Sequence, residues 1–202
     1  RELEVELRPG VDDALLERVV EHLARQGVAV AESPSTLARA LAAKVPGAVR
    51  LRGDDFLDPT RSHQRSATWD GVDRARLVRD VLVPFRERRA SMFQRFDWST
   101  RALGTPEPVP AGEVMLVDLI GLFCPETAEA LDLRVWCDVD LDTATLRGMA
   151  RDARFGCDHV ELWQHVWGPN ERDFVERFDP RATADVVLPD AIWAEIAESA
   201  GT

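Results

Sequence analysis

Short apolar runs alternate with helix-like segments along this chain. Residues 28–30 and 48–51 have the length and apolar content of short strands. The segment between them begins at Ser35 and Thr36, which can cap a helix, and continues with helical spacing. This order predicts a βαβ unit. Residues 1–26 combine alternating apolar positions with a helical pattern, which predicts an N-terminal supporting segment leading into the first core strand.

The alternation of strand-like and helix-like segments continues to the end of the chain. The spacing of apolar residues predicts a helix over 73–85 and a second helix that Asp142 caps. Residues 114–117 and 133–139 are apolar runs typical of buried parallel strands, and 184–188 reads as a final strand. Strands that alternate with helices in this way favour an open α/β domain.

Carboxylates follow two of the predicted strands. Asp54 and Asp55 come just after 48–51, and Asp118 ends the strand at 114–117. In open α/β sheets, ligands bind outside the carboxyl ends of the strands, so this edge is where chemistry is expected. A plain turn after the strand is the alternative interpretation of the Asp54-Asp55 pair.

Composition narrows the class of protein. A chain of 202 residues with 45% hydrophobic content fits one domain with a sizeable core. The net charge of −11 argues against nucleic-acid binding, and the absence of a long apolar run argues against a membrane span. Three widely spaced cysteines suggest a reducing compartment. We therefore expect a cytoplasmic protein, and Lys44 is its only lysine.

The stretch around the first helix resembles a known family. Residues 35–37 (Ser-Thr-Leu) and 54–56 (Asp-Asp-Phe) are similar to motifs of the uridine kinase-like branch of the P-loop kinases, within the phosphoribulokinase/uridine kinase superfamily. The resemblance implies an α/β, three-layer P-loop kinase-like domain over 1–202. That fold has a parallel sheet of about five strands with helices on both faces and a helical lid, here at about 147–176.

Weaker matches continue in the same order along the chain. Residues 68–70 resemble the turn before a family helix, Phe96 stands in the position of a family tyrosine, and Arg101 stands where uridine kinases carry a histidine. Arg147 and Arg151, the latter followed by an aspartate, match the family's lid motif. The changes at Phe96 and Arg101 indicate that the acceptor is not simply uridine.

The resemblance also implies roles for individual residues. It implies ATP or another NTP as phosphoryl donor, Mg²⁺, and a small-molecule acceptor. Helix caps, a solvated arginine stripe and ordinary core aromatics remain the alternative interpretations of these residues. The implied roles are a catalytic base at Asp54, magnesium ligation by Ser35 and Asp118, phosphate binding by Ser35, Thr36, Arg147 and Arg151, and acceptor binding by Asp55, Trp69, Phe96 and Arg101.

The phosphate loop itself does not match. Between Glu32 and Ser35 stand only Ser33 and Pro34, whereas a phosphate cradle needs several glycines and a terminal lysine. Either the loop is degenerate or the sequence lacks some of its residues. We expect an NTP-dependent kinase that phosphorylates a hydroxyl of a nucleoside-like metabolite, and homo-oligomers are left open.

Two alternative functions also stay open. The chain could be a kinase-like scaffold that binds a ligand without NTP turnover. It could also run a non-phosphoryl reaction in the same pocket, with Asp54 and Asp55 as its acid and base.

Overall fold

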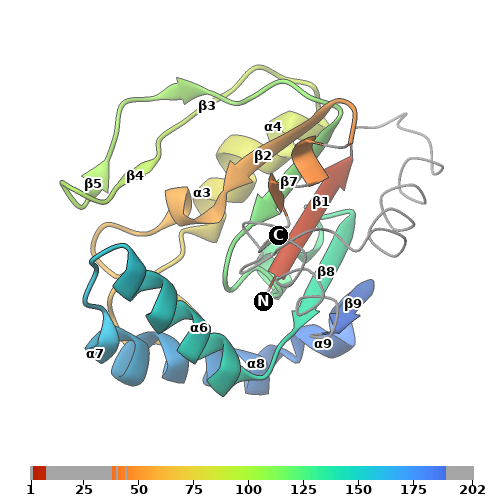
Figure 1. Cartoon of the computed structure of the whole chain (residues 1–202). Helices are drawn as coiled ribbons and strands as arrows, with labels where there is room; N and C mark the ends of the chain where they lie inside the picture. The colour runs from red at the N-terminus through yellow and green to blue at the C-terminus, as the bar shows by residue number, and fades with distance from the viewer. Residues whose placement is uncertain (1, 8–37, 40, 44, 190–202) are drawn as a thin grey trace, which may run out of the picture.

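The computed structural model describes residues 2–7, 38–39, 41–43 and 45–189, drawn in colour in Figure 1. The strand predicted at 28–30, together with Ser35 and Thr36, lies outside the described residues.

A mixed sheet of five strands forms the centre of the described chain. Its order is β2-β7-β1-β8-β9. The strands are β1 (Glu2–Leu7), β2 (Ala48–Arg52), β7 (Val114–Asp118), β8 (Leu133–Asp138) and β9 (Val186–Pro189). β2 pairs with β7 in parallel, as does β8 with β9. The α/β class predicted from the sequence is therefore confirmed.

The prediction of a wholly parallel sheet is wrong at the centre. β1 lies between β7 and β8 and runs antiparallel to both. It comes from the segment predicted to be an N-terminal support leading into the first core strand. A central strand is paired along both edges in either direction, so the alternating pattern of this segment does not reveal its direction. The antiparallel strand separates two parallel pairs, and the carboxyl ends of β2 and β7 remain side by side.

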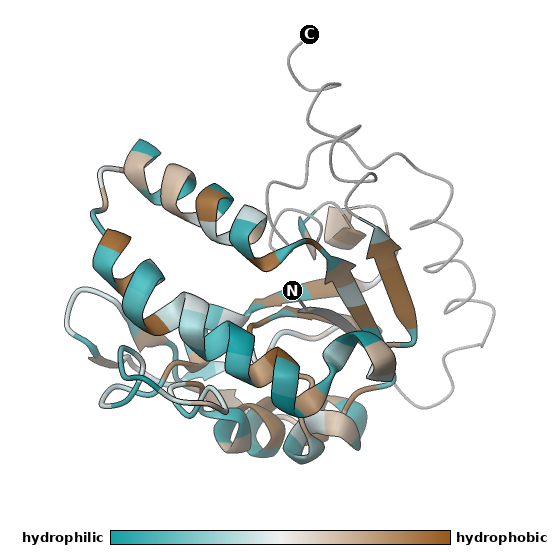
Figure 2. Cartoon of the chain, turned by 90° about the horizontal axis from the view of Figure 1, so that it is seen from below, coloured by the Kyte–Doolittle hydropathy of each residue, from teal (hydrophilic) through white to brown (hydrophobic). Residues whose placement is uncertain are grey.

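The pattern of β7 explains its place in the interior. All five of its residues are buried, as expected for a strand covered on both faces. Figure 2 shows strands of the sheet in the hydrophobic colour, while the helices carry much of the hydrophilic colour. The core continues from β7 through Leu51, Phe56 and the apolar face of the helix at 74–86.

That helix confirms the prediction over 73–85. It runs through α3 (Arg74–Leu77), the wide turn η2 (Val78–Leu82) and α4 (Val83–Arg86). The Asp73 side chain caps it by accepting a hydrogen bond from the Arg76 backbone N–H. Pro84 has no N–H to donate to the preceding turn, which fits the widened turn before it. The residues it buries are Leu77, Val81, Leu82 and Phe85.

A second helical unit covers the region predicted as a lid. α6 (Leu141–Arg154) is followed by α7 (Val160–Leu162), η3 (Trp163–Trp167) and α8 (Gly168–Phe178), and Figure 1 shows them together beside the sheet. We call residues 141–178 the lid hairpin. α9 (Pro180–Thr183) then leads to β9.

The cap of α6 differs from the prediction. Asp140 is the N-cap, and its carboxylate accepts a 2.9 Å hydrogen bond from the Thr143 backbone N–H. Asp142 lies in the first turn with its side chain 86% exposed. Either aspartate satisfies a capping pattern by composition, and the non-helical backbone of Asp140 (φ −52°, ψ 137°) makes it the cap.

Short elements complete the described structure. η1 (Gly53–Phe56) follows β2, and α5 (Pro125–Ala128) follows β7. Residues 92–108, which we call the arm, form two small ladders and project away from the sheet in Figure 1. The ladders pair β3 (Met92–Phe93) with β6 (Glu107–Pro108), and β4 (Phe96–Asp97) with β5 (Ala102–Leu103). Within the described residues, no helix has the length and hydrophobicity needed to cross a membrane.

Candidate functional site

The ends of β2 and β7 bring two predicted site residues together. Gly53 makes the close approach feasible: a Cβ at this position would lie 2.3 Å from the backbone oxygen of Asp118 and from the side chain of Leu119. Only glycine fits such a contact. Asp54 follows directly in η1, so its carboxylate is placed near that of Asp118.

Asp54 combines solvent access with a perturbed pKa. Neighbouring protein atoms remove part of the hydration of the Asp54 carboxylate, and this is the main cause that raises its pKa. The negative charge of Asp118 raises the pKa further. The positive charges of Arg52 and Arg151 oppose that rise in pKa. The Asp54 side chain is 58% exposed, so water and small molecules still reach the carboxylate.

Asp118 is held by an arginine that the sequence analysis did not single out. Arg50 Nε donates to Asp118 Oδ1 at 3.1 Å, and Arg50 Nη2 donates to Oδ2 at 3.0 Å. The two side chains are 18% and 4% exposed. Arg50 belongs to β2 and Asp118 to β7, so this two-pronged ion pair ties the neighbouring strands at their carboxyl ends.

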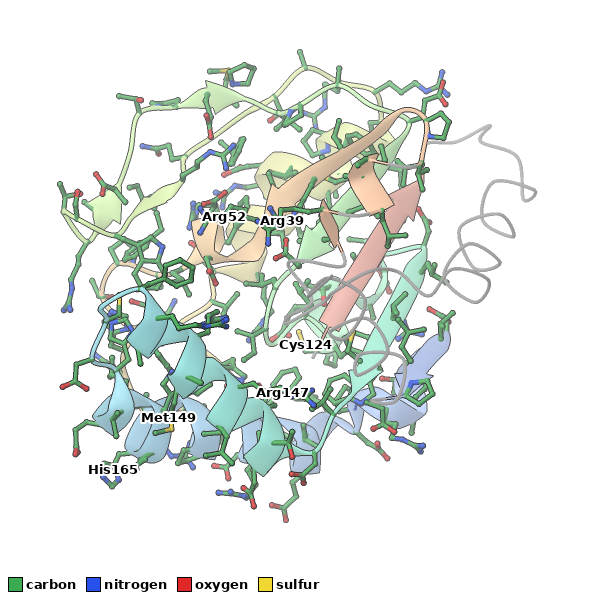
Figure 3. The ribbon with its side chains drawn as sticks, viewed as in Figure 1. Arg39, Arg52, Cys124, Arg147, Met149 and His165 are labelled. Carbon is green, nitrogen blue, oxygen red and sulfur yellow. The ribbon has the colours of Figure 1, made fainter. Side chains whose placement is uncertain are left out.

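The lid hairpin contributes Arg151. Its positive charge opposes the rise in the pKa of Asp54, so the guanidinium lies within electrostatic range of that carboxylate. Arg151 Nη2 also donates to Asp152 Oδ1 at 2.9 Å. Arg147, exposed and one turn earlier on α6, is labelled in Figure 3. Residues four apart share a helix face, so Arg147 and Arg151 project from the same side of the lid.

Asp152 fixes the geometry of the lid hairpin. Its Oδ2 accepts hydrogen bonds from Trp163 Nε1 at 2.9 Å and pairs with His159 Nδ1 at 3.1 Å. Burial alone raises the pKa of Asp152, but hydrogen bonds from Trp163, Arg151 and His159 outweigh it and lower that pKa. The aspartate of the lid motif therefore joins α6 to α7 and η3, and it orients Arg151.

Asp55 pairs with the arm. It is 4% exposed, and its carboxylate pairs with the guanidinium of Arg95. Arg95 also pairs with Glu107 across the arm. Burial raises the pKa of Asp55, and Arg95 opposes that rise. Asp55 therefore anchors the arm to η1.

Two aromatic residues predicted for the acceptor site belong to the core. Trp69 is 4% exposed, and its Nε1 donates to the buried Glu171 at 3.2 Å. Phe96 is 3% exposed and meets the edge of Trp98 with ring centroids 5.4 Å apart. Trp98 is 44% exposed, so it is the aromatic side chain of this group with an open face.

Arg101 lies where the arm meets the lid. It is exposed in the turn between β4 and β5. After burial, its charge is the next cause that lowers the pKa of His63. The His63 ring lies between Trp98 of the arm and Trp167 of the lid hairpin, with centroids 6.1 Å from each. The arm and the lid therefore meet around His63.

The structure thus sorts the predicted residues into three groups. Asp54, Asp118 and Arg151 come together at the sheet edge, with Arg147 on the same lid face. Asp55, Trp69, Phe96 and Arg101 lie in or beside the arm and its packing. Ser35 and Thr36 lie outside the described residues.

Two arginines at this edge were missed. Arg50 and Arg52 alternate along β2, so their side chains lie on one face of the strand. Arg52 approaches Asp54 at 3.9 Å, and Figure 3 labels it at the end of β2. Their spacing of two, followed by Gly53 and Asp54, was the signal in the sequence that could have marked them.

The described residues do not fit magnesium at Asp118. Both carboxylate oxygens are engaged by Arg50. Across the described ranges, no cluster of three or more histidine, cysteine, aspartate or glutamate side chains could hold a metal ion. Mg²⁺ demands near-octahedral oxygen ligands and keeps several waters, which a carboxylate locked to a guanidinium does not offer. We therefore assign no step to a metal at this position.

Comparison with known proteins identifies the fold. No family model matches the chain, and no curated protein matches its sequence. Among solved structures, a possible uridine kinase from Bacillus stearothermophilus matches with a TM-score of 0.58 at 14% identity, covering 87% of this chain and 97% of the other. A candidate fructose transport system kinase from Silicibacter sp. matches with a TM-score of 0.57 at 18% identity, covering 89% and 100%. The chain shares the fold of these two proteins.

Proposed function

We propose that the chain is an NTP-dependent kinase that transfers a phosphoryl group to a hydroxyl of a nucleoside-like or related small metabolite. The observation that carries this proposal is the meeting of Asp54, Asp118 and Arg151 at the carboxyl edge of β2 and β7. This is the edge where open α/β folds bind their ligands. The fold shared with the two kinases adds support.

Asp54 would act as the general base. The acceptor hydroxyl gives its proton to an Asp54 carboxylate oxygen while its oxygen bonds to the γ-phosphorus of the nucleotide. The bond from that phosphorus to the bridging oxygen breaks, and the nucleoside diphosphate leaves. A raised pKa brings an aspartate closer to the working pH, which makes it a better base.

Arg151 would stabilise the transferred group. Phosphoryl transfer depends mainly on positioning and on positive charge near the equatorial oxygens. Arg151 is oriented by Asp152 and acts on the site of Asp54. We assign Arg147 the same task one turn away, and Ser35 and Thr36 the binding of the donor phosphates.

The arm would form the acceptor side. Arg101 and the open ring of Trp98 are its exposed groups near the lid. Trp69 and Phe96 would shape this side from behind, and Asp55 would hold it in place through Arg95. Because Asp55 is buried and paired, its placement gives little support to a reaction that uses Asp54 and Asp55 as acid and base.

A scaffold without NTP turnover is the second candidate. Two observations favour it: the stretch from Glu32 to Ser35 has no glycine or lysine, and Asp118 is engaged by Arg50. Such a protein would bind an anionic ligand at the same edge without phosphoryl transfer.

An assay of γ-phosphoryl transfer from radiolabelled ATP to a panel of nucleosides and sugars tests the proposal. Asp54→Asn should lower the rate by about 10²–10⁴-fold, the usual contribution of a general base. Asp142→Asn, at an aspartate whose side chain is 86% exposed, should leave it unchanged. ATP binding without transfer to any acceptor would favour the scaffold, and equal activity of the Asp54 variant would remove Asp54 from the mechanism.

A further inference from the structure

The pairing of Arg50 with Asp118 is the feature of the sheet edge that the proposed mechanism does not use. The Arg50 side chain is 18% exposed and the Asp118 side chain 4% exposed, and two hydrogen bonds of 3.1 and 3.0 Å join them. A carboxylate so deeply buried needs a compensating charge, because an isolated buried anion is costly. Arg50 supplies that charge from the neighbouring strand.

The geometry of the pair leaves little room for a metal ion. The planar fork of arginine matches both oxygens of a carboxylate, and here both are in use. A divalent cation placed at Asp118 would also meet the repulsion of the Arg50 charge at close range. With 4% of the Asp118 side chain exposed, the waters that Mg²⁺ retains would have little access.

We propose that Arg50 is the resident cation of this edge of the sheet. Its guanidinium holds Asp118 where a divalent ion would otherwise bind, so Asp118 orients Arg50 and is not a metal ligand. The fixed positive charge beside Asp118 is therefore carried by the protein. This inference does not depend on the proposed kinase activity, because it concerns only the affinity of the chain for a metal.

A purely structural ion pair predicts a different response to mutation. If the pair only joined β2 to β7, the removal of Arg50 would weaken the fold and do nothing more. If Arg50 takes the place of a metal ion, the removal leaves a buried carboxylate next to Asp54, and the two oxygen donors then attract a divalent cation.

A titration with Mn²⁺ in the absence of nucleotide separates these cases. The electron paramagnetic resonance signal of the free ion measures how much Mn²⁺ stays unbound. The wild-type protein and Asp118→Asn should bind Mn²⁺ equally weakly. Arg50→Met should gain a site at least about tenfold tighter than wild type, since it loses a repelling charge. The double variant Arg50→Met/Asp118→Asn should lose that site again.

Arg52→Met is the matched control. It removes an exposed arginine two residues along the same strand and should create no site that depends on Asp118. A folded Arg50→Met protein with no gain in affinity would overturn the proposal. So would wild-type Mn²⁺ binding that Asp118→Asn abolishes.

A measurement on the wild-type protein covers the case in which the variants do not fold. The Arg50 Nε–H resonance in a ¹⁵N spectrum should keep its intensity when Mn²⁺ is added at concentrations that a protein-bound site would capture. Selective broadening of that resonance would place a metal at Asp118 and overturn the proposal.

Discussion

At the residue scale, Gly53 decides whether the candidate site can form. Its missing side chain lets the end of β2 reach the backbone of Asp118 and the side chain of Leu119. That contact sets Asp54 beside Asp118, whose negative charge adds to the effect of burial in raising the pKa of Asp54. A single small residue therefore connects strand packing to the electrostatics of the proposed base.

Gly53→Ala should destabilise the protein. The added Cβ would lie 2.3 Å from backbone and side-chain atoms of β7 and the residue after it, so the strands must separate. Such overpacking costs about 1–3 kcal/mol in the free energy of unfolding, measured by urea titration. Gly104→Ala is the control, because its Cβ would meet one atom at an ordinary 3.5 Å. Equal stability of the two variants would show that β2 and β7 are less tightly packed than described.

The sequence predicts some of these residues and not others. Asp54 and Asp118 follow apolar runs, and parallel strands bring such ends together, so their meeting could be anticipated. The engagement of Asp118 by Arg50 could not, since an arginine within a short strand reads equally well as a solvated edge position. Trp69 and Asp55 were expected to face the acceptor, and only tertiary packing shows that Glu171 and Arg95 hold them.

At the element scale, the loop after η1, which includes residues 63–66, contacts both the lid hairpin and the arm, and the three segments form one assembly. Asn170 of α8 is 1% exposed; its Oδ1 accepts from the Ser66 backbone N–H at 2.8 Å, and its Nδ2 donates to the Gln64 carbonyl at 3.1 Å. These bonds hold the loop against the lid. Across the described residues, His63 in that loop carries the one buried side-chain nitrogen or oxygen without a hydrogen-bond partner, Nδ1.

Protonation of His63 should weaken this assembly. Burial, the charge of Arg101 and that of His159 lower the pKa of His63 in the folded protein. The unfolded chain therefore binds the proton more tightly than the folded protein does. Above the ordinary histidine pKa of about 6.5, neither state is protonated at His63, so the free energy of unfolding is unaffected. It falls as the pH drops through that value and stops falling below the folded pKa. Unfolding free energies measured between pH 5 and pH 8, about the range over which histidine titrates, should show this loss.

His63→Gln should flatten that pH dependence between the two pKa values. His165→Gln is the control, because the His165 side chain is 69% exposed and pairs with Glu161 on the surface. If the unfolding free energy of the His63 variant changes with pH as steeply as that of the wild type, another group causes the pH dependence. Protonation of His63 would then not weaken the contact between the arm and the lid hairpin.

At the scale of the whole molecule, the chain shares the fold of a possible uridine kinase and a candidate fructose transport system kinase. Its central strand β1 nevertheless runs antiparallel to both neighbours, against the predicted parallel sheet. Periodicity places apolar residues in a sheet but does not give the direction of a strand with partners on both sides. The helix at 74–86 and the strands β2, β7 and β8 were predictable from local pattern. The position of β1 depends on packing over the whole domain.

A molecule with this fold and a net charge of −11 should bind a nucleotide only if positive charge gathers locally at the sheet edge. Arg52 and Arg151 supply such positive charge near Asp54 and oppose the effect of Asp118 there. Addition of ATP should therefore raise the thermal unfolding midpoint. At 100 times the dissociation constant, the stabilisation is about 2.7 kcal/mol, and a domain of this size gains roughly 2–4 °C for each kcal/mol.

Arg151→Gln should reduce the ATP-induced shift, because it removes a charge oriented toward the site by Asp152. Arg79→Gln, at an exposed arginine paired with Asp80 on the helix at 74–86, should shift as the wild type does. The midpoints without nucleotide show whether either variant is less stable on its own. Equal shifts of the wild type and Arg151→Gln would mean that the lid arginine does not contact the phosphates. If neither protein shifts, the edge binds no nucleotide. The search for ligands should then turn to anions without a triphosphate.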